Sequence, residues 1–314
     1  MILTPEILTI FILNSIFLLF GTIAFYLSLK IYLGWDMNST TKKQYMLQKQ
    51  SYLSSTFIKY IFIVKLPLFL FFIFTLDKLS GSLVGAMCAA GVVNATSYGV
   101  YLFILKILNL YLFGFWLLLH KKDISDETLP YTKKKFGLFT IIYFIFLAEI
   151  IVESLMFLNI DPSIMVSCCG TLYSATADSY ISVLFKLNPI YLVALFYINF
   201  LAIVVAYIFK NRYLYSILSI LFLLSSIVSL IVFFGTYIYE LPTHHCPFCF
   251  LQKDYYYIGY LLYVTLFIGT FYAMVLPFFY KRKYLSISFI FIIIYTAIVS
   301  AYPLVYFIIN GVWL

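Results

Sequence analysis

Residues 213–238 read YLYSILSILFLLSSIVSLIVFFGTYI, a stretch of apolar and small side chains that contains no charged residue. A helix rises about 1.5 Å per residue, so a segment of this length crosses the roughly 30 Å of hydrocarbon in a lipid bilayer. Seven more stretches of comparable length complete the predicted set of spans, which covers residues 7–33, 53–76, 99–119, 137–158, 189–209, 213–238, 255–279 and 286–309. We therefore expect an all-α integral membrane protein, with residues 1–314 forming a single polytopic membrane domain.

The composition excludes the main alternatives to a membrane protein. Of the 314 residues, 64% are hydrophobic and 10% are charged, whereas about 25% of residues are charged in soluble domains. The mean hydropathy is +1.04, which also excludes a disordered chain. The net charge of +8 comes from short basic runs between apolar stretches. Such runs set the orientation of a membrane protein, so we expect no nucleic-acid binding. The sequence contains no P-loop or Rossmann fingerprint, so we expect no nucleotide binding either.

The distribution of these basic residues predicts the orientation. Fifteen Lys and Arg residues fall on one side of the predicted membrane, and only Lys78, Lys186 and Lys253 fall on the other. Basic connections stay in the cytoplasm. We therefore expect both termini outside, in a bacterial inner membrane, with the sparsely charged connections 77–98, 159–188 and 239–254 on the periplasmic side.

The cysteines supply the most specific motif. All five fall in these outer connections, at Cys88, Cys168, Cys169, Cys246 and Cys249. The last two belong to the run His244-His245-Cys246-Pro247-Phe248-Cys249. A C-x-x-C pair closes and reopens a small disulfide, or chelates a soft metal such as copper or zinc with histidines as further ligands. A structural disulfide is the third interpretation of this motif.

The local sequence favours a reactive thiol at Cys246. Pro247 suits the first position of a helix, which makes Cys246 its N-cap and places the helix dipole and two imidazoles beside its sulfur. Cys249 is then the resolving thiol. A C-x-x-C at the outer end of a membrane helix resembles membrane thiol oxidoreductases of the DsbB and vitamin K epoxide reductase type. That resemblance implies a quinone as electron acceptor, although those proteins have fewer than eight spans.

The remaining cysteines are weaker candidates. Cys168 and Cys169 are adjacent, and a disulfide between neighbours is strained, so we expect them to pair elsewhere, exchange with Cys246, or bind a metal. With His244, His245, Cys246 and Cys249, they form the predicted metal-ligand set. Cys88 lies among alanines and glycine in AMCAAG, where packing is the commoner role for a cysteine.

Four charged residues lie within predicted spans. Glu149 and Glu153 are four residues apart and share one face of a helix, while Lys106 and Lys65 lie in two other spans. A charge at this depth costs at least about 2.5–3.5 kcal/mol, so we expect these residues to pair or to line a wet cavity. They form the predicted proton or ion path; structural ion pairing is the alternative.

Three functions follow from these motifs. The first is a thiol–disulfide oxidoreductase or thiol-based electron-transfer protein, linked to a quinone. The second is a membrane protein that binds or delivers copper or zinc, and the third is a transporter or membrane anchor subunit with structural cysteines. The expected partners are the lipid bilayer and an exoplasmic thiol or metal-binding protein.

Overall fold

The computed structural model describes residues 4–36, 39, 41–166 and 188–314. All regular secondary structure within these ranges is helical. Eight helices are long and apolar enough to cross a membrane, which confirms the all-α class and the eight predicted spans. Their outward faces carry many exposed Leu, Ile, Phe and Tyr side chains, as expected for helices that contact lipid.

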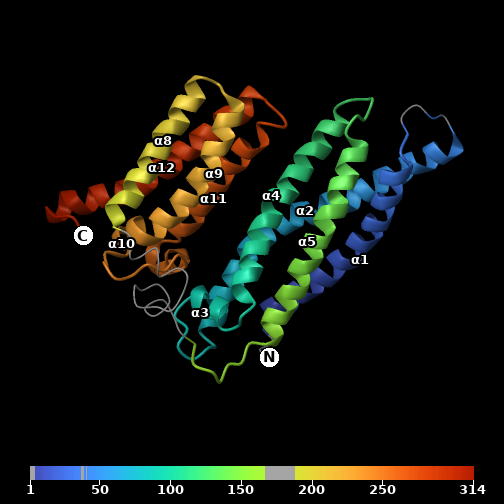
Figure 1. Ribbon diagram of the computed structural model, residues 1–314. Helices are drawn as coiled ribbons and strands as arrows, with labels where there is room; N and C mark the ends of the chain where they lie inside the picture. Colours follow the sequence, from blue (N-terminus) through green and yellow to red (C-terminus); the bar gives the residue numbers. More distant parts are fainter. Residues whose placement is uncertain (1–3, 37–38, 40, 167–187) are drawn as a thin grey trace. The chain divides into compact units, whose positions relative to one another are not determined.

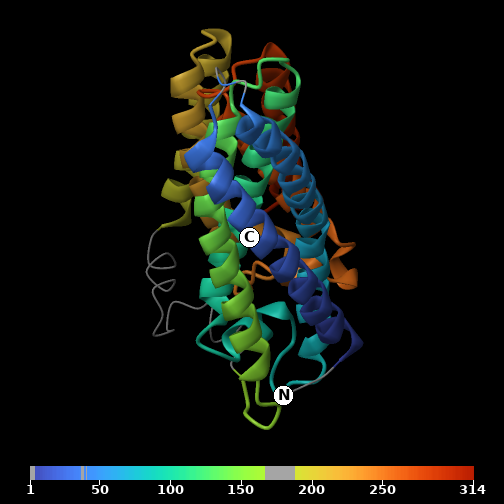
Figure 2. The same cartoon turned by 90° about the vertical axis from the view of Figure 1, so that its right-hand side faces the viewer.

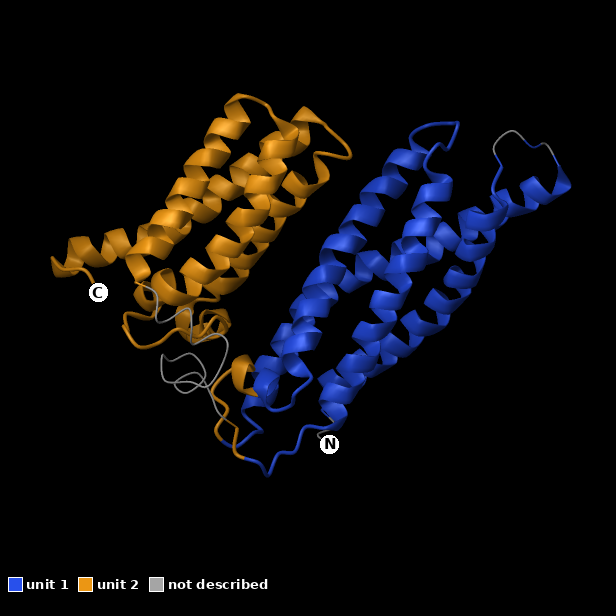
Figure 3. Cartoon of the chain, in the orientation of Figure 1, with its two compact units in different colours: residues 1–84, 92–164 blue, residues 85–91, 165–314 orange. Residues whose placement is uncertain are grey.

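The chain divides into two compact units, coloured separately in Figure 3. Unit 1 comprises residues 1–84 and 92–164, and unit 2 comprises residues 85–91 and 165–314. The short segment 85–91 therefore belongs with the second half of the chain, although it lies in the sequence of the first half. The prediction of a single membrane domain stays a prediction.

Unit 1 is a bundle of four long helices, α1 (Pro5–Gly34), α2 (Lys42–Ser80), α4 (Gly99–Ile124) and α5 (Thr132–Leu158) (Figure 1). Helix α1 packs against α2 and α5, and α4 packs against the same two helices, so the four helices enclose one core. Figure 2 shows α1, in dark blue, running beside α5, in green. Aromatic rings fill much of this core, and Phe62 stacks on Phe113 with 4.2 Å between ring centroids.

Unit 2 contains four spans and the connections that carry the outer motifs. The spans are α8 (Pro189–Ile208), a continuous segment from α9 (Arg212–Ser229) through a π-helical turn (Leu230–Phe234) to α10 (Gly235–Tyr239), α11 (Ile258–Val275) and α12 (Arg282–Asn310). Two 3₁₀ turns, Cys249–Leu251 and Lys253–Tyr255, precede α11. The short helix α3 (Ala89–Asn94) begins in segment 85–91 and continues into unit 1.

Side-chain caps explain where several helices begin. The hydroxyl of Thr4 accepts from the Ile7 N–H ahead of α1, and the Asn188 side chain accepts from the Ile190 N–H at the start of α8. In both helices a proline occupies the first position, where its missing N–H costs nothing.

Prolines mark the interior or the end of three spans. Pro67 and Pro303 lie inside α2 and α12, as the sequence predicts. Pro277 lies within the predicted span 255–279, but α11 ends at Val275, so this proline follows the helix. A proline cannot donate the next backbone hydrogen bond, which accounts for the earlier end.

The predicted orientation is tested by cysteines introduced at exposed loop positions. A membrane-impermeant maleimide applied to intact cells is expected to label Thr243→Cys and to spare Ser125→Cys, because the two residues lie in connections of opposite predicted side. Both native side chains are exposed, so access to the reagent depends on the side of the membrane alone. Labelling of Ser125→Cys alone would invert the topology.

Candidate functional site

Unit 2 brings Cys88 together with Cys246 and Cys249, which lie more than 150 positions later in the sequence. The sulfur atoms of Cys88, Cys246 and Cys249 all lie within 4.8 Å of one another. The Cys88 and Cys246 sulfurs are 3.5 Å apart, well beyond the disulfide bond length of about 2.05 Å. All three residues are buried, and Cys88 and Cys246 are 0% exposed. These residues are the cysteine cluster.

Hydrogen bonds from tyrosines hold the loop that carries two of these cysteines. The hydroxyl of Tyr239, at the end of α10, donates to the Cys246 carbonyl and accepts from the Phe250 N–H at 3.1 Å. Tyr263 of α11 donates to the Pro247 carbonyl at 2.7 Å. These bonds satisfy main-chain groups in a loop with little regular structure, so they fix the positions of the Cys246 and Cys249 backbones.

A separate hydrogen bond joins the segment that carries Cys88 to the loop that carries Cys246 and Cys249. The Gln252 side chain donates to the Met87 carbonyl at 3.1 Å. It ties the residue directly before Cys88 to the turn directly after the Cys249–Leu251 helix. The third sulfur is therefore held by the same loop that carries the other two.

The expected helix at Pro247 does not form, so the prediction that Cys246 caps a helix leading into the seventh span is wrong. Residues 247–248 form a turn, Cys249–Leu251 is a single 3₁₀ turn, and α11 begins only at Ile258. The Cys246 sulfur instead accepts from the Phe248 N–H at 3.4 Å. Because no helix begins at Cys246, the helix dipole and the row of N–H groups expected there do not stabilise a thiolate.

The two histidines lie beside the cysteine cluster but outside it. His245 Nδ1 lies 3.1 Å from the carbonyl oxygen of Ile231, within the π-helical turn. His244 packs its ring edge-on against Tyr239, and its buried Nε2 has no hydrogen-bond partner among the described residues. Burial lowers the pKa of both histidines, so both are neutral at pH 7. Neutral imidazoles do not stabilise a thiolate by charge, but they are the form that binds metals.

The structure therefore revises the predicted set of site residues. It brings Cys246 and Cys249 together with Cys88, which sequence reasoning assigned to packing. Cys168 and Cys169 lie outside the described residues. No signal in AMCAAG itself identifies Cys88 as a partner, because its neighbours in space come from residues more than 150 positions later.

Gly259, the second residue of α11, is expected to be essential for the shape of the cysteine loop. A β-carbon at this position would lie 2.8 Å from Leu251 Cδ2 and would also collide with the ring of Phe250. Gly259→Ala is therefore expected to destabilise unit 2 by about 1–3 kcal/mol, the usual cost of overpacking. Thermal unfolding of the purified protein measures this change. Gly81→Ala is the control, since a β-carbon there meets only one atom, at 3.8 Å; equal stability of both variants contradicts the assignment.

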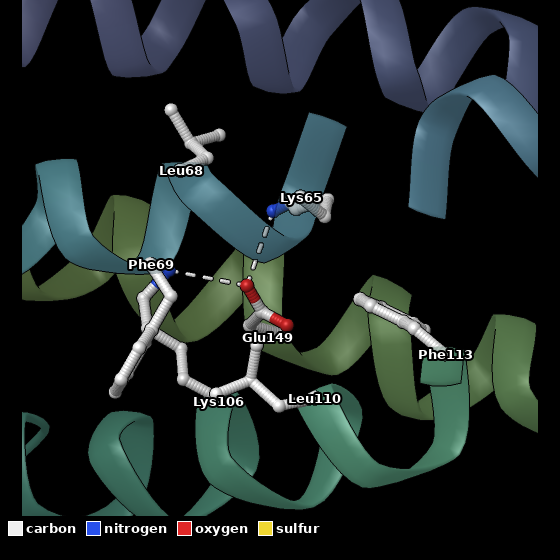
Figure 4. Close-up of a pocket in the computed structure, with 7 residues that line it drawn as sticks. All are labelled: Lys65, Leu68, Phe69, Lys106, Leu110, Phe113 and Glu149. Carbon is white, nitrogen blue, oxygen red and sulfur yellow. Dashed lines mark hydrogen bonds and ion pairs between the residues drawn. The ribbon is translucent and has the colours of Figure 1, made fainter. Parts of the chain in front are cut away.

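Unit 1 holds a second candidate site, and Figure 4 shows part of it. The nitrogens of Lys65 and Lys106 both lie 3.1 Å from Glu149 Oε1. Lys106 also lies 2.8 Å from Glu153 Oε1. All four side chains are at least nine-tenths buried. The structure thus brings together the four charged residues predicted for a proton or ion path.

Two asparagines that sequence reasoning did not single out complete this buried ionic network. Asn14 of α1 donates to Glu153 Oε2 at 2.8 Å and accepts from Lys65 at 3.0 Å. Asn109 of α4 donates to Glu149 Oε2. The network has two positive and two negative charges, so it is neutral as a whole. Every one of the four helices of unit 1 contributes a member, and the network therefore fixes their mutual register.

A small cavity adjoins the network between α2 and α4. It is lined by Lys65, Leu68, Phe69, Lys106, Leu110, Phe113 and Glu149, and its volume is about 10 Å³ (Figure 4). This is close to the minimum needed to hold one water molecule. The contacts of the buried ionic network support a role in fixing the arrangement of the helices. A role of the network as a proton or ion path stays a prediction.

Another buried ion pair closes the turn between α4 and α5. Lys135 lies 2.6 Å from Asp123 Oδ2, and the Asp123 carboxylate also accepts from the Tyr131 N–H and the Thr132 hydroxyl, each at 2.8 Å. The Trp116 indole donates to the Lys135 carbonyl at 2.9 Å. These contacts join the two helix ends. The sequence did not reveal this arrangement, because both charges lie within strongly charged runs.

Comparison with known proteins supplies no further assignment. A scan against protein-family models, a search of curated proteins and a search of solved structures each found no match to this chain. The eight apolar helices fit an integral membrane protein, and the function must be argued from the two sites themselves.

Proposed function

We propose that this integral membrane protein binds a soft metal ion, copper(I) or zinc, through the thiolates of Cys88, Cys246 and Cys249. The observation that carries the proposal is the approach of three cysteine sulfurs to within 4.8 Å of one another. Thiolates are the ligands that select these metals. The two cysteines of a C-x-x-C motif suit either disulfide exchange or metal binding. A third sulfur close to both favours metal binding.

The distances support this proposal. Sulfur binds zinc at about 2.3 Å, so two tetrahedral thiolate ligands are separated by roughly 3.8 Å. The 3.5 Å between the Cys88 and Cys246 sulfurs is close to this value. Copper(I) is satisfied by three thiolates, whereas zinc in a structural site takes four ligands. No fourth ligand atom among the described residues joins the three sulfurs within 4.8 Å, so the site suits copper(I) better than zinc.

Burial also favours a held metal over a reactive thiol. Reactive cysteines are partly exposed and lie in electropositive surroundings. Here Cys246 is 0% exposed, and the neighbouring imidazoles are neutral at pH 7. A metal ion in this position is shielded from water, and exchange with an exoplasmic metal-binding protein requires the loop to open.

Metal analysis of the purified protein tests the proposal. Protein purified without chelators, or loaded with copper(I) or zinc, is expected to retain one ion per chain by mass spectrometry of the elements. X-ray absorption at the metal edge is expected to give three sulfur neighbours at about 2.2–2.3 Å. Failure of both metals to bind, or binding that persists in a Cys246→Ser/Cys249→Ser double variant, would overturn it.

Thiol–disulfide exchange is the second candidate, favoured by the short separation of Cys88 and Cys246. Attack of the Cys88 thiolate on a disulfide between Cys246 and Cys249 would form a new bond between Cys88 and Cys246 and release the Cys249 thiolate. Electrons balance, because one disulfide replaces another. A metal-free protein whose thiol count changes between oxidising and reducing buffers would support this function over metal binding.

A further inference from the structure

A group of lysines and tyrosines gathers at the end of unit 1 where α1 and α4 end and α5 begins. The ammonium nitrogens of Lys122 and Lys134 lie 4.7 and 5.9 Å from the centre of the Tyr131 ring. The Lys133 nitrogen lies 5.9 Å from the centre of the Tyr32 ring. Three helices therefore contribute to one group, and these five residues are the lysine patch.

Positive charge greatly exceeds negative charge at this end of unit 1. Residues 30–59 and 119–136 hold ten lysines and only four acidic residues. One lysine and one acidic residue of this set form the buried ion pair that closes the turn between α4 and α5. The side chains of Lys133 and Lys134 are exposed, so their charges are available to a partner outside the chain.

The start of α5 is an unfavourable place for lysine unless an anion lies nearby. Its first turn contains Lys133, Lys134 and Lys135 and no acidic residue. The N-terminus of a helix carries the positive end of the helix dipole, so cations there are destabilising. Asp123 offsets the charge of Lys135, but no ion pair among the described residues offsets Lys133 or Lys134. An external anion would reduce the repulsion between these two charges and the dipole.

The lysine patch lies at the level of the phosphate groups of a bilayer. Lys122 follows the predicted span 99–119 by three residues, and Lys133 and Lys134 precede the span 137–158 by four and three. At about 1.5 Å per residue, these positions are roughly 4–6 Å beyond the hydrocarbon. A bilayer is about 30 Å thick without its head groups and about 40–45 Å with them, so each head-group layer is roughly 5–8 Å thick. Lipid phosphates are therefore the nearest anions.

We propose that the lysine patch binds the head groups of anionic phospholipids such as phosphatidylglycerol. The phosphate of such a lipid keeps its negative charge, whereas the ammonium of a zwitterionic head group cancels it. Lysine clusters directly beside a membrane span attract anionic lipids for this reason. Each ammonium is positioned over a tyrosine ring and has N–H groups to donate to phosphate oxygens. An acidic protein segment would have to enter the head-group layer to meet the same lysines.

Native mass spectrometry of the purified, delipidated protein in a neutral detergent tests this site. The probes are phosphatidylglycerol and phosphatidylcholine with identical acyl chains, and the wild type is expected to bind phosphatidylglycerol more tightly. Lys133→Gln/Lys134→Gln is expected to weaken binding of phosphatidylglycerol about 25-fold, because each lysine near an anionic head group contributes about five-fold. Binding of phosphatidylcholine is expected to remain the same.

Lys78→Gln/Lys253→Gln is the matched control, since it removes two exposed lysines from the opposite predicted side and changes the net charge equally. It is expected to bind phosphatidylglycerol as the wild type does. Lys133→Arg/Lys134→Arg keeps both charges and is expected to retain binding, and thermal unfolding verifies that all variants are folded. Equal affinity of the wild type for the two lipids would overturn the proposal, as would equal losses in the two glutamine variants. Complete competition by inorganic phosphate at the concentration of the lipid would also overturn it, because the patch would then bind a soluble anion.

Discussion

Replacement of Cys88 by serine is expected to lower the affinity for copper(I) or zinc by at least about 100-fold. Changes to residues that only support metal ligands already reduce affinity about 10- to 100-fold, and Cys88 is proposed as a ligand itself. Serine retains the size of the side chain but does not supply a thiolate. Competition with a chromogenic chelator of known affinity, at fixed pH, measures the change.

Met87→Leu is the control for this experiment. Met87 precedes Cys88 and also carries sulfur, but its side chain is exposed, and the variant keeps its main-chain carbonyl, which accepts from Gln252. It is expected to bind metal as the wild type does. An unchanged affinity in Cys88→Ser would contradict the three-thiolate site and leave Cys246 and Cys249 as a pair, as the C-x-x-C motif alone implies.

The spans could be predicted from sequence because apolarity over about 20 residues is a local property. The helix ends were less predictable. Helix α2 begins at Lys42, 11 residues before the predicted span 53–76, because its polar first turns remain helical beyond the hydrophobic stretch. Its start is set by the Thr41 cap, which accepts from the Gln44 N–H at 3.4 Å. Hydrophobicity locates the membrane segment, whereas capping locates the helix.

The candidate sites depended on contacts that no local pattern encodes. The pairing of Cys88 with Cys246 joins residues 158 positions apart, and it required segment 85–91 to pack with unit 2. The asparagines of the ionic network did leave a signal. Asn14 and Asn109 are amides within otherwise apolar spans, where an unpaired polar group is costly. Their positions within the predicted spans indicate that they lie in the membrane, as the four charged residues do. Only the structure identifies their hydrogen-bond partners.

Glu149→Gln is expected to destabilise unit 1 by about 3–5 kcal/mol, the cost of breaking a buried ion pair by removing one partner. Glutamine keeps the shape of glutamate, so packing is nearly preserved. Because Glu149 Oε1 contacts both Lys65 and Lys106, its neutralisation leaves two lysines with Glu153 alone. One positive charge then has no compensating charge in the network. The free energy of unfolding in mixed micelles measures the loss.

A second substitution that restores neutrality is expected to recover most of this stability. Lys65→Met removes one of the two lysines and keeps an apolar side chain of similar length. The double variant Glu149→Gln/Lys65→Met retains the ion pair of Lys106 with Glu153 and the bond from Asn14 to Glu153. The remaining deficit is expected to be about 1 kcal/mol, for the lost hydrogen bond from Lys65 to Asn14.

Lys59 provides the matched control for the loss of a lysine from α2. It lies on the same helix as Lys65, but its side chain is exposed and no ion pair of it is present among the described residues. Glu149→Gln/Lys59→Met removes the same two charges from the chain as the first double variant and leaves the buried excess charge in place. It is expected to remain as unstable as Glu149→Gln. If both double variants recover equally, total charge and not the buried network governs stability; if neither recovers, the four charges do not act as one neutral unit.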